Sequence, residues 1–149
     1  MQSNKIQIAI VISEFHSTIT ERLLKGTLDA FNAWELNNKE IIVHRVPGAF
    51  EISSTVNQII INNKPTAIIA VGCVIRGETS HYDYVAAESA RCLADLSLKY
   101  NIPIINGILT TDNNLHAMER SKLGENNRGY DAMVAAIKMI KVYEKIQST

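Results

Sequence analysis

The sequence contains few of the residues that mark disulfide-rich, metal-binding or membrane proteins. Its 149 residues include only two cysteines, Cys73 and Cys92, too few for a disulfide framework or a cysteine-ligated metal cluster. No apolar run approaches the roughly 20 residues that a membrane-spanning helix requires. The apolar stretch that follows the first five residues lacks the small-residue cleavage site of a signal peptide. We therefore expect two partly buried, reduced thiols in a cytoplasmic protein.

An excess of charge of one sign is also absent. Fifteen Lys and Arg residues balance fifteen Asp and Glu residues, so the formal net charge at pH 7 is zero. Proteins that bind nucleic acids or membrane surfaces usually carry a basic excess, so the composition argues against both kinds of partner. His16, His44 and His116 lie far apart in the sequence, with no carboxylate at ligand spacing. The sequence therefore predicts no metal site.

Strand and helix patterns alternate along the chain, with no linker or repeat between them. Apolar β-branched runs predict strands, and apolar residues spaced by three and four predict helices. The predicted strands cover residues 6–12, 40–46, 66–75 and 103–109. The predicted helices cover residues 19–34, 50–61, 82–100, 114–121 and 130–145. This order predicts one α/β domain, residues 1–149, with helices on both faces of a parallel sheet.

Polar, aromatic and ionisable residues follow the predicted strands. Ligands of parallel α/β sheets bind beyond the carboxyl ends of the strands. The segments expected there are residues 13–16, 47–51, 76–81 and 110–112. Phe15 could stack on a planar ring or simply cover the core, and Glu51 could accept ligand hydrogen bonds or complement a helix dipole. Arg120, at the end of a predicted helix, is favoured there by the dipole, and its functional use would be a phosphate clamp.

The loop at residues 76–81 is the most informative of these segments. Ser80 and Asp83 are spaced as in a capping box, and the first turn of a helix offers free N–H groups to an anion. Gly77 would let the backbone approach a phosphate closely. His81 is placed to exchange a proton with a ligand held by the loop. The same residues also fit an ordinary strand-to-helix turn with an exposed histidine.

Three motifs carry a resemblance to a known family. They are residues 46–52 (VPGAFEI), 72–85 (GCVIRGETSHYDYV) and 106–111 (NGILTT), in this order and at matching spacing. Over essentially its whole length the sequence resembles the 6,7-dimethyl-8-ribityllumazine synthase family of riboflavin biosynthesis. The resemblance implies a flavodoxin-like fold, a three-layer α/β/α sandwich with a four-stranded parallel sheet.

The resemblance also implies a transferase reaction and the residues that perform it. Family members condense 5-amino-6-(D-ribitylamino)uracil with 3,4-dihydroxy-2-butanone 4-phosphate to give the lumazine, phosphate and water, without a metal or organic cofactor. By position, His81 would move protons. The residues that would bind the pyrimidine and its ribityl chain are Phe15, Ala49, Phe50, Glu51, Val74, Ile75 and Asn106. The residues that would bind the butanone phosphate are Gly77, Glu78, Thr79 and Arg120.

The resemblance further implies an oligomer. The family builds its active site between neighbouring subunits of a homopentamer, and some members assemble twelve pentamers into a capsid; riboflavin synthase is a further implied partner. Residues 120–129 contain no insertion relative to capsid-forming members. Three positions depart from the family pattern. His16 replaces a common asparagine, Asn106 replaces a frequent phenylalanine that covers the neighbouring subunit's pyrimidine, and Gly124 replaces a lysine that contacts phosphate in some members.

Two other functions stay open at this point. An archaeal-type riboflavin synthase is a relative that uses the lumazine product, and a flavin- or lumazine-binding carrier would perform no turnover. Gly77, Glu78 and Thr79 favour the phosphate-releasing synthase over a riboflavin synthase, while His81 and Arg120 argue against a carrier.

Because imine formation, phosphate loss and ring closure need no covalent nucleophile, the predicted catalyst acts mainly by holding two substrates together and moving protons.

Overall fold

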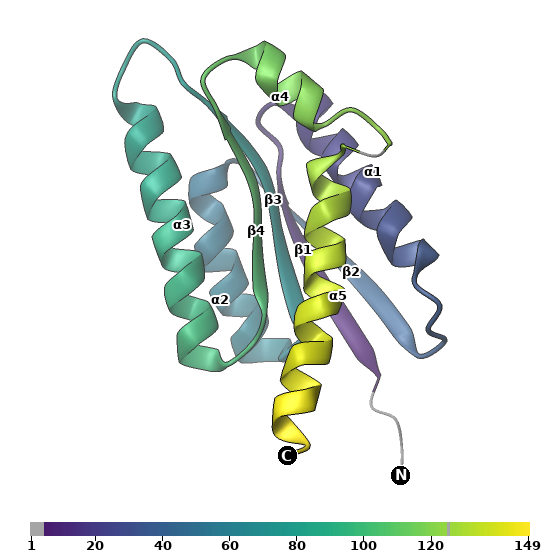
Figure 1. The fold of residues 1–149 in the computed structure, drawn as a ribbon. Coiled ribbons are helices and arrows are strands. Elements are labelled where there is room, and N and C mark those ends of the chain that lie inside the picture. Colours follow the sequence, from purple (N-terminus) through teal and green to yellow (C-terminus); the bar gives the residue numbers. More distant parts are fainter. Residues whose placement is uncertain (1–4, 125) are drawn as a thin grey trace.

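A computed structural model describes residues 5–124 and 126–149 and shows a parallel sheet between two helical layers (Figure 1). The strands are β1 (Ile6–Ser13), β2 (Lys39–Val46), β3 (Ala67–Ile75) and β4 (Ile104–Thr111). The helices are α1 (Ser17–Ala33), α2 (Ile52–Asn63), α3 (His81–Tyr100), α4 (Asn114–Arg120) and α5 (Arg128–Gln147), with a 3-10 turn, η1 (Ala49–Glu51), before α2. The predicted fold class is confirmed, and the element boundaries differ from the prediction by a few residues.

The strand order creates a switch point between β1 and β3. The order is β2-β1-β3-β4, and each neighbouring pair is parallel. The chain leaves β1 in one direction to form β2 and then crosses back to form β3 on the other side. Helices α1, α4 and α5 lie on one face of the sheet and α2 and α3 on the other (Figure 1). In sheets of this kind, ligands bind beyond the carboxyl ends of the strands at such a switch point.

The central strands are almost entirely apolar because both of their faces are buried. In β1, Ile8, Ile10 and Ile12 enter the core formed with α1 and α5. The alternate residues Ala9 and Val11 enter the core formed with α2 and α3. Burial on both faces explains why such runs are continuous rather than alternating. It also makes the central strands a fixed support for the segments that follow them.

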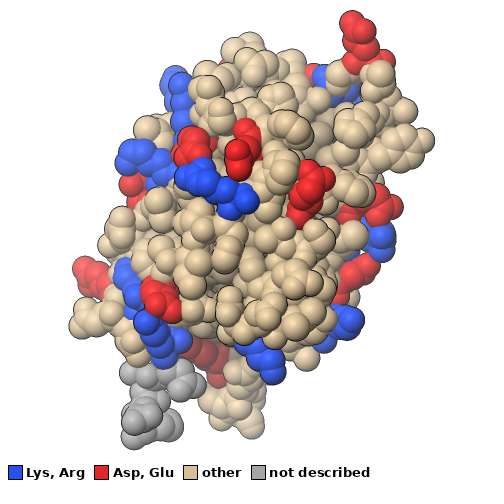
Figure 2. Space-filling model, turned by 180° about the vertical axis from the view of Figure 1, so that it is seen from behind, with Lys and Arg blue, Asp and Glu red and all other residues tan. Residues whose placement is uncertain are grey.

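The outer surface agrees with the balanced composition. On the face shown in Figure 2, the described Lys, Arg, Asp and Glu side chains are interspersed, without a broad patch of one sign. No helix among the described residues is long and apolar enough to cross a membrane. Within residues 5–124 and 126–149, no group of three or more His, Cys, Asp and Glu side chains is placed to hold a metal ion.

Candidate active site

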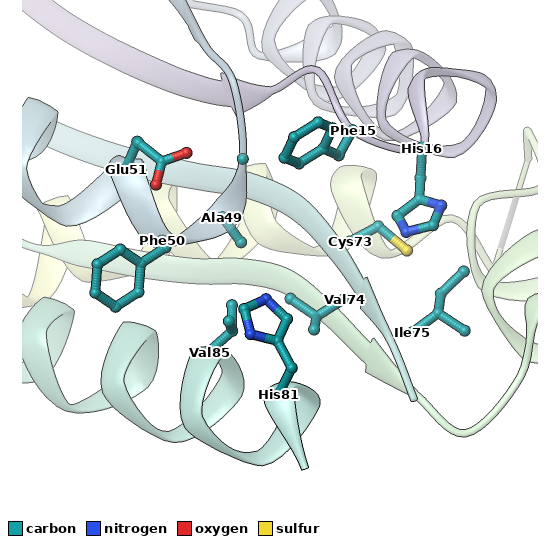
Figure 3. Close-up of a pocket in the computed structure, with 11 residues that line it drawn as sticks. Phe15, His16, Ala49, Phe50, Glu51, Cys73, Val74, Ile75, His81 and Val85 are labelled. Carbon is teal, nitrogen blue, oxygen red and sulfur yellow. The ribbon is translucent and has the colours of Figure 1, made fainter. Parts of the chain in front are cut away.

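A cavity of about 360 Å³ lies beyond the carboxyl ends of β1 and β3, at the switch point (Figure 3). This volume suits a small-molecule ligand. Seven of the predicted site residues line it: Phe15, Ala49, Phe50, Glu51, Val74, Ile75 and His81. His16, Gly48, Cys73 and Val85 complete the lining, and sequence reasoning had assigned none of these four a role in binding. The cavity therefore joins segments that follow β1 and β2, the end of β3 and the start of α3.

Phe15 is held at the cavity by pairing between the loops that follow β1 and β2. The backbone N–H of Glu14 donates to the carbonyl oxygen of Val46 (2.8 Å), and that of Phe15 donates to Pro47 (3.0 Å). A Cβ atom added to Gly48 would lie 2.8 Å from Cδ2 of the Phe15 ring, so glycine leaves room for this ring. The Phe15 side chain is 64% exposed. An exposed ring over a cavity offers a surface on which a planar ligand can stack.

His81 projects from the first turn of α3 into the cavity, beside Val74 and Val85 (Figure 3). Its backbone N–H donates to Oγ1 of Thr79 (3.3 Å). The lining of the cavity stops at Ile75 and resumes at His81. The predicted phosphate-binding residues, Gly77, Glu78 and Thr79, are exposed in the loop between these two positions. The loop thus lies at the edge of the cavity.

The predicted capping box at the start of α3 is wrong. Ser80 occupies the N-cap position, but within the described chain its side chain makes no capping hydrogen bond. The backbone N–H of Asp83 donates instead to the backbone oxygen of Ser80 (3.1 Å). The Asp83 carboxylate faces Arg76, with Oδ1 3.3 Å from Nη1. The Asp83 carboxylate therefore pairs with a side chain that precedes α3.

Two of the three departures from the family pattern have positive φ angles. His16, just before α1, has φ 59° and ψ 49°, a left-handed conformation that asparagine and histidine tolerate better than most residues. Its backbone oxygen accepts from Ile19 and Thr20, which starts the helix, while its side chain lies near Cys73 in the cavity wall (Figure 3). Gly124 has φ 114°, where a lysine would be strained.

Cys73 lies at the base of the same cavity. The residue is buried and free of disulfides, and burial raises the pKa of its thiol to about 11. The thiolate is the nucleophilic form of cysteine, so Cys73 is a neutral, weakly reactive wall residue near pH 7. Cys92, on α3, is partly exposed and also free.

Asn106 and Arg120 lie apart from this group. They line a second cavity, of about 390 Å³, between β4 and α5, together with Arg128 and Asp131. The Asn106 side chain accepts a hydrogen bond from the backbone N–H of Ile108 (3.1 Å). Arg120 donates from Nη1 to a backbone oxygen one turn earlier in α4 (3.3 Å). Within one chain, Asn106 and Arg120 therefore line a different cavity from the other predicted site residues, and Gly77, Glu78 and Thr79 line neither of the two.

Comparisons with known proteins agree with this architecture. Residues 5–144 match the model of a family described as 6,7-dimethyl-8-ribityllumazine synthase. A relative of that name from Protochlamydia amoebophila is 43% identical over 143 residues, which cover 96% of this chain and 83% of the relative. Relatives of the same name from Campylobacter hominis and Prosthecochloris aestuarii are 40% and 35% identical over 146 residues, covering 98% of this chain and 94% of each relative.

Proposed function

The chain belongs to the 6,7-dimethyl-8-ribityllumazine synthase family, and on that basis we propose that the cavity at the switch point is the site of its reaction. The chain is a transferase of riboflavin biosynthesis. It condenses 5-amino-6-(D-ribitylamino)uracil with 3,4-dihydroxy-2-butanone 4-phosphate and forms 6,7-dimethyl-8-ribityllumazine. One observation carries the assignment of the site: Phe15, Glu51 and His81, from distant parts of the sequence, line one cavity.

In the proposed complex, the pyrimidine occupies the side of the cavity formed by Phe15 and η1. The uracil ring stacks on Phe15, and Phe50, itself 61% exposed, flanks it. The carboxylate of Glu51 accepts hydrogen bonds from the ribityl hydroxyls. Val74 and Ile75, where β3 ends, offer backbone groups to the polar edge of the ring. Exposed aromatic rings beside a half-buried carboxylate support this placement.

The butanone phosphate occupies the other side, at the loop between β3 and α3. Apart from Gly77 and its two chain neighbours, no atom of the described residues lies within 4 Å of a Cβ placed on Gly77, so an anion can approach the backbone there. The N–H groups of Gly77, Glu78 and Thr79 bind the phosphate, and Arg120 of a neighbouring subunit adds a positive charge. This arrangement leaves the carbonyl group of the substrate close to the pyrimidine amine.

The chemistry then needs proximity and proton transfer. The 5-amino group attacks the ketone and water leaves to form an imine; the phosphate is eliminated; the ribitylamino nitrogen closes the ring with loss of a second water. Each step moves a proton, and His81 is the ionisable side chain of the cavity that adjoins the phosphate loop. An imidazole suits this work because it commonly exchanges protons near neutral pH. Fixing both substrates in contact supplies the remaining acceleration.

The proposal includes a homopentamer as the active unit. Its support is the division of the site residues between two cavities, since Asn106 and Arg120 lie apart from the Phe15–His81 cavity within one chain. In an oligomer, the β4 cavity of one subunit would face the switch-point cavity of the next. The proposal extends to a capsid of twelve pentamers, to association with riboflavin synthase and to a cytoplasmic location, with which two free thiols are consistent.

Incubation with both substrates tests the proposed function. We expect the absorbance and fluorescence of the lumazine to appear faster than in an enzyme-free control, with an equal amount of phosphate released. An archaeal-type riboflavin synthase would instead consume added lumazine and release no phosphate. A carrier would bind lumazine without forming it. Either of these outcomes would overturn the proposal.

A further inference from the structure

Arg76 joins three segments at the carboxyl edge of the sheet. It is the residue that follows β3, and its backbone N–H donates to the oxygen of Thr111 at the end of β4 (2.9 Å). Its side chain donates from Nε to Oδ1 of Asp112 (3.1 Å) and from Nη1 to Oδ1 of Asp83 (3.3 Å). Its guanidinium carbon lies 4.4 Å from the centre of the Tyr82 ring. One side chain therefore connects β3, the start of α3 and the residue after β4.

These contacts fix both ends of the loop at residues 77–80. The loop is exposed, and it lies beyond the sheet where β3 and β4 end (Figure 1). Arg76 precedes the loop, and Tyr82 and Asp83 follow it in the first turn of α3. Because Arg76 contacts both of these residues, it sets the distance that the loop must span. That distance limits the shapes that the loop backbone can adopt.

Arg76 also balances two negative charges beside the loop. The side chains of Asp83 and Asp112 are 60% and 71% exposed, and both face the guanidinium. The hydrogen bond to Asp112, followed by the charges of both aspartates, raises the pKa of Arg76 above its ordinary value. Without Arg76, two carboxylates would stand unneutralised next to a loop that binds a phosphate dianion, and like charges repel.

We infer that Arg76 is a positioning residue for the butanone phosphate: it holds the loop at residues 77–80 in the shape that receives the anion and prevents Asp83 and Asp112 from repelling it. The inference rests on the proposed function. Arg76 acts through the loop and not by direct contact with the phosphate. The N–H groups of its guanidinium donate to two carboxylates, and the guanidinium lies over the ring of Tyr82. The planar guanidinium of arginine suits these three contacts better than the compact ammonium group of lysine would.

Substitution of Arg76 tests the inference. Arg76→Met should raise the KM for the butanone phosphate about 10-fold, because the loop loses its support and two carboxylates then repel the phosphate, with kcat and the KM for the pyrimidine within about twofold of wild type. Arg76→Lys should recover part of the loss, since it restores the charge without the planar guanidinium. Adding Asp83→Asn and Asp112→Asn to Arg76→Met should also recover part of it, because the repelling charges are removed. A purely structural role predicts no such rescue.

Arg91 provides a matched control. It lies on α3 and also pairs with two carboxylates, those of Glu88 (2.7 Å) and Asp95 (2.9 Å), with 60% of its side chain exposed. Arg91→Met should leave both KM values unchanged. Titration with inorganic phosphate should show the same order of affinity, wild type above Arg76→Lys above Arg76→Met.

Two results would overturn the inference. Arg76→Met could bind the butanone phosphate and inorganic phosphate as tightly as wild type, or it could lose affinity for the pyrimidine and the butanone phosphate equally. A wild-type chain that forms no lumazine would overturn the proposed function instead. In that case the titration with inorganic phosphate would still decide the role of Arg76.

Discussion

At His81, proton transfer and structural support predict different results for the same substitutions. Positioned acid–base groups contribute about 10²–10⁴-fold to turnover, and we expect His81→Ala to lower kcat at the lower end of this range, because the two substrates remain in contact without the imidazole. Binding of either substrate should change less than kcat. His81→Asn should lose kcat to a similar extent, since an amide does not exchange protons near neutral pH.

The comparison of kcat, ligand affinity and melting temperature in these two variants separates the roles. If His81 only supports the first turn of α3, His81→Asn should keep most of the activity while His81→Ala melts at a lower temperature. Turnover close to wild type in both variants would remove His81 from the mechanism. The site would then act by positioning alone.

The two thiols offer an internal comparison of reactivity. Cys73 is 4% exposed and burial raises its pKa to about 11, whereas Cys92 is partly exposed. Iodoacetamide at about pH 8 should therefore modify Cys92 well before Cys73, as peptide mass spectrometry would show. Similar rates at both positions would contradict the burial of Cys73 in solution.

The raised pKa of Cys73 also has a consequence for alkaline stability. Because the folded-state pKa lies above the ordinary value of 9.0, the neutral thiol contributes stability that is fully present below about pH 9 and is lost as the pH rises towards 11. A shift from 9.0 to about 11 corresponds to a loss of at most about 3 kcal/mol. Denaturant melts of Cys73→Ala should therefore show a shallower decline than wild type over this pH range.

At the scale of elements, Asn127 connects three helices. Its side chain is 1% exposed and donates from Nδ2 to the backbone oxygens of Arg22 (3.1 Å) in α1 and Ser121 (2.9 Å) after α4. Its Oδ1 accepts from the backbone N–H of Tyr130 (3.0 Å) and so caps α5. Asn127→Ala removes the cap and both hydrogen bonds that the buried Nδ2 group donates. We expect a loss of about 2–4 kcal/mol in unfolding free energy, measured in urea.

Asn113 is the matched control for this substitution. Its Oδ1 caps α4 through the backbone N–H of His116 (2.9 Å), but the residue is exposed and serves one helix. Asn113→Ala should cost about 1 kcal/mol. Equal losses in the two variants would show that the buried contacts of Asn127 add nothing to its capping bond.

The strands and helices were predictable from the sequence because each buried face requires apolar residues at a fixed local spacing. The run at residues 66–75 predicted β3, since both faces of that strand are covered and nearly every residue is apolar. The expectation that ligands bind beyond the carboxyl ends of parallel strands then placed Phe15, Glu51 and His81 at one edge of the sheet. The contacts of Arg76 were not predictable, because its partners lie 7 and 36 residues away and depend on how β3, α3 and β4 pack. The capping box failed for the same reason.

At the scale of the whole molecule, a single chain leaves exposed the surfaces that the proposed oligomer would cover. On α3, Tyr84 is 68% exposed and Leu98 is 80% exposed. Strand β4 forms an edge of the sheet and carries the exposed Asn106. A partner chain is one means by which proteins protect an unpaired sheet edge, and it would also cover apolar side chains such as these. Sedimentation should therefore show an oligomer and no stable, active monomer.

If the active site is shared between subunits, two variants damaged in different cavities should complement each other. Phe15→Ala damages the switch-point cavity, and Arg120→Ala damages the β4 cavity. Random assembly of equal amounts of the two chains leaves about a quarter of the interfaces with both halves intact. Co-expression should thus restore about a quarter of the wild-type kcat/KM, measured with both substrates well below their KM values.

A second pair of variants provides the control for complementation. Phe15→Ala and His81→Ala damage the same cavity, so no interface in their mixture is intact and no activity beyond the mean of the two should return. Native mass spectrometry would establish that both mixtures contain mixed oligomers. Mixed oligomers of Phe15→Ala and Arg120→Ala that recover nothing would place Arg120 outside the neighbouring site. Full activity in a wild-type monomer would contradict a shared site altogether, because the two cavities would then have to work within one chain.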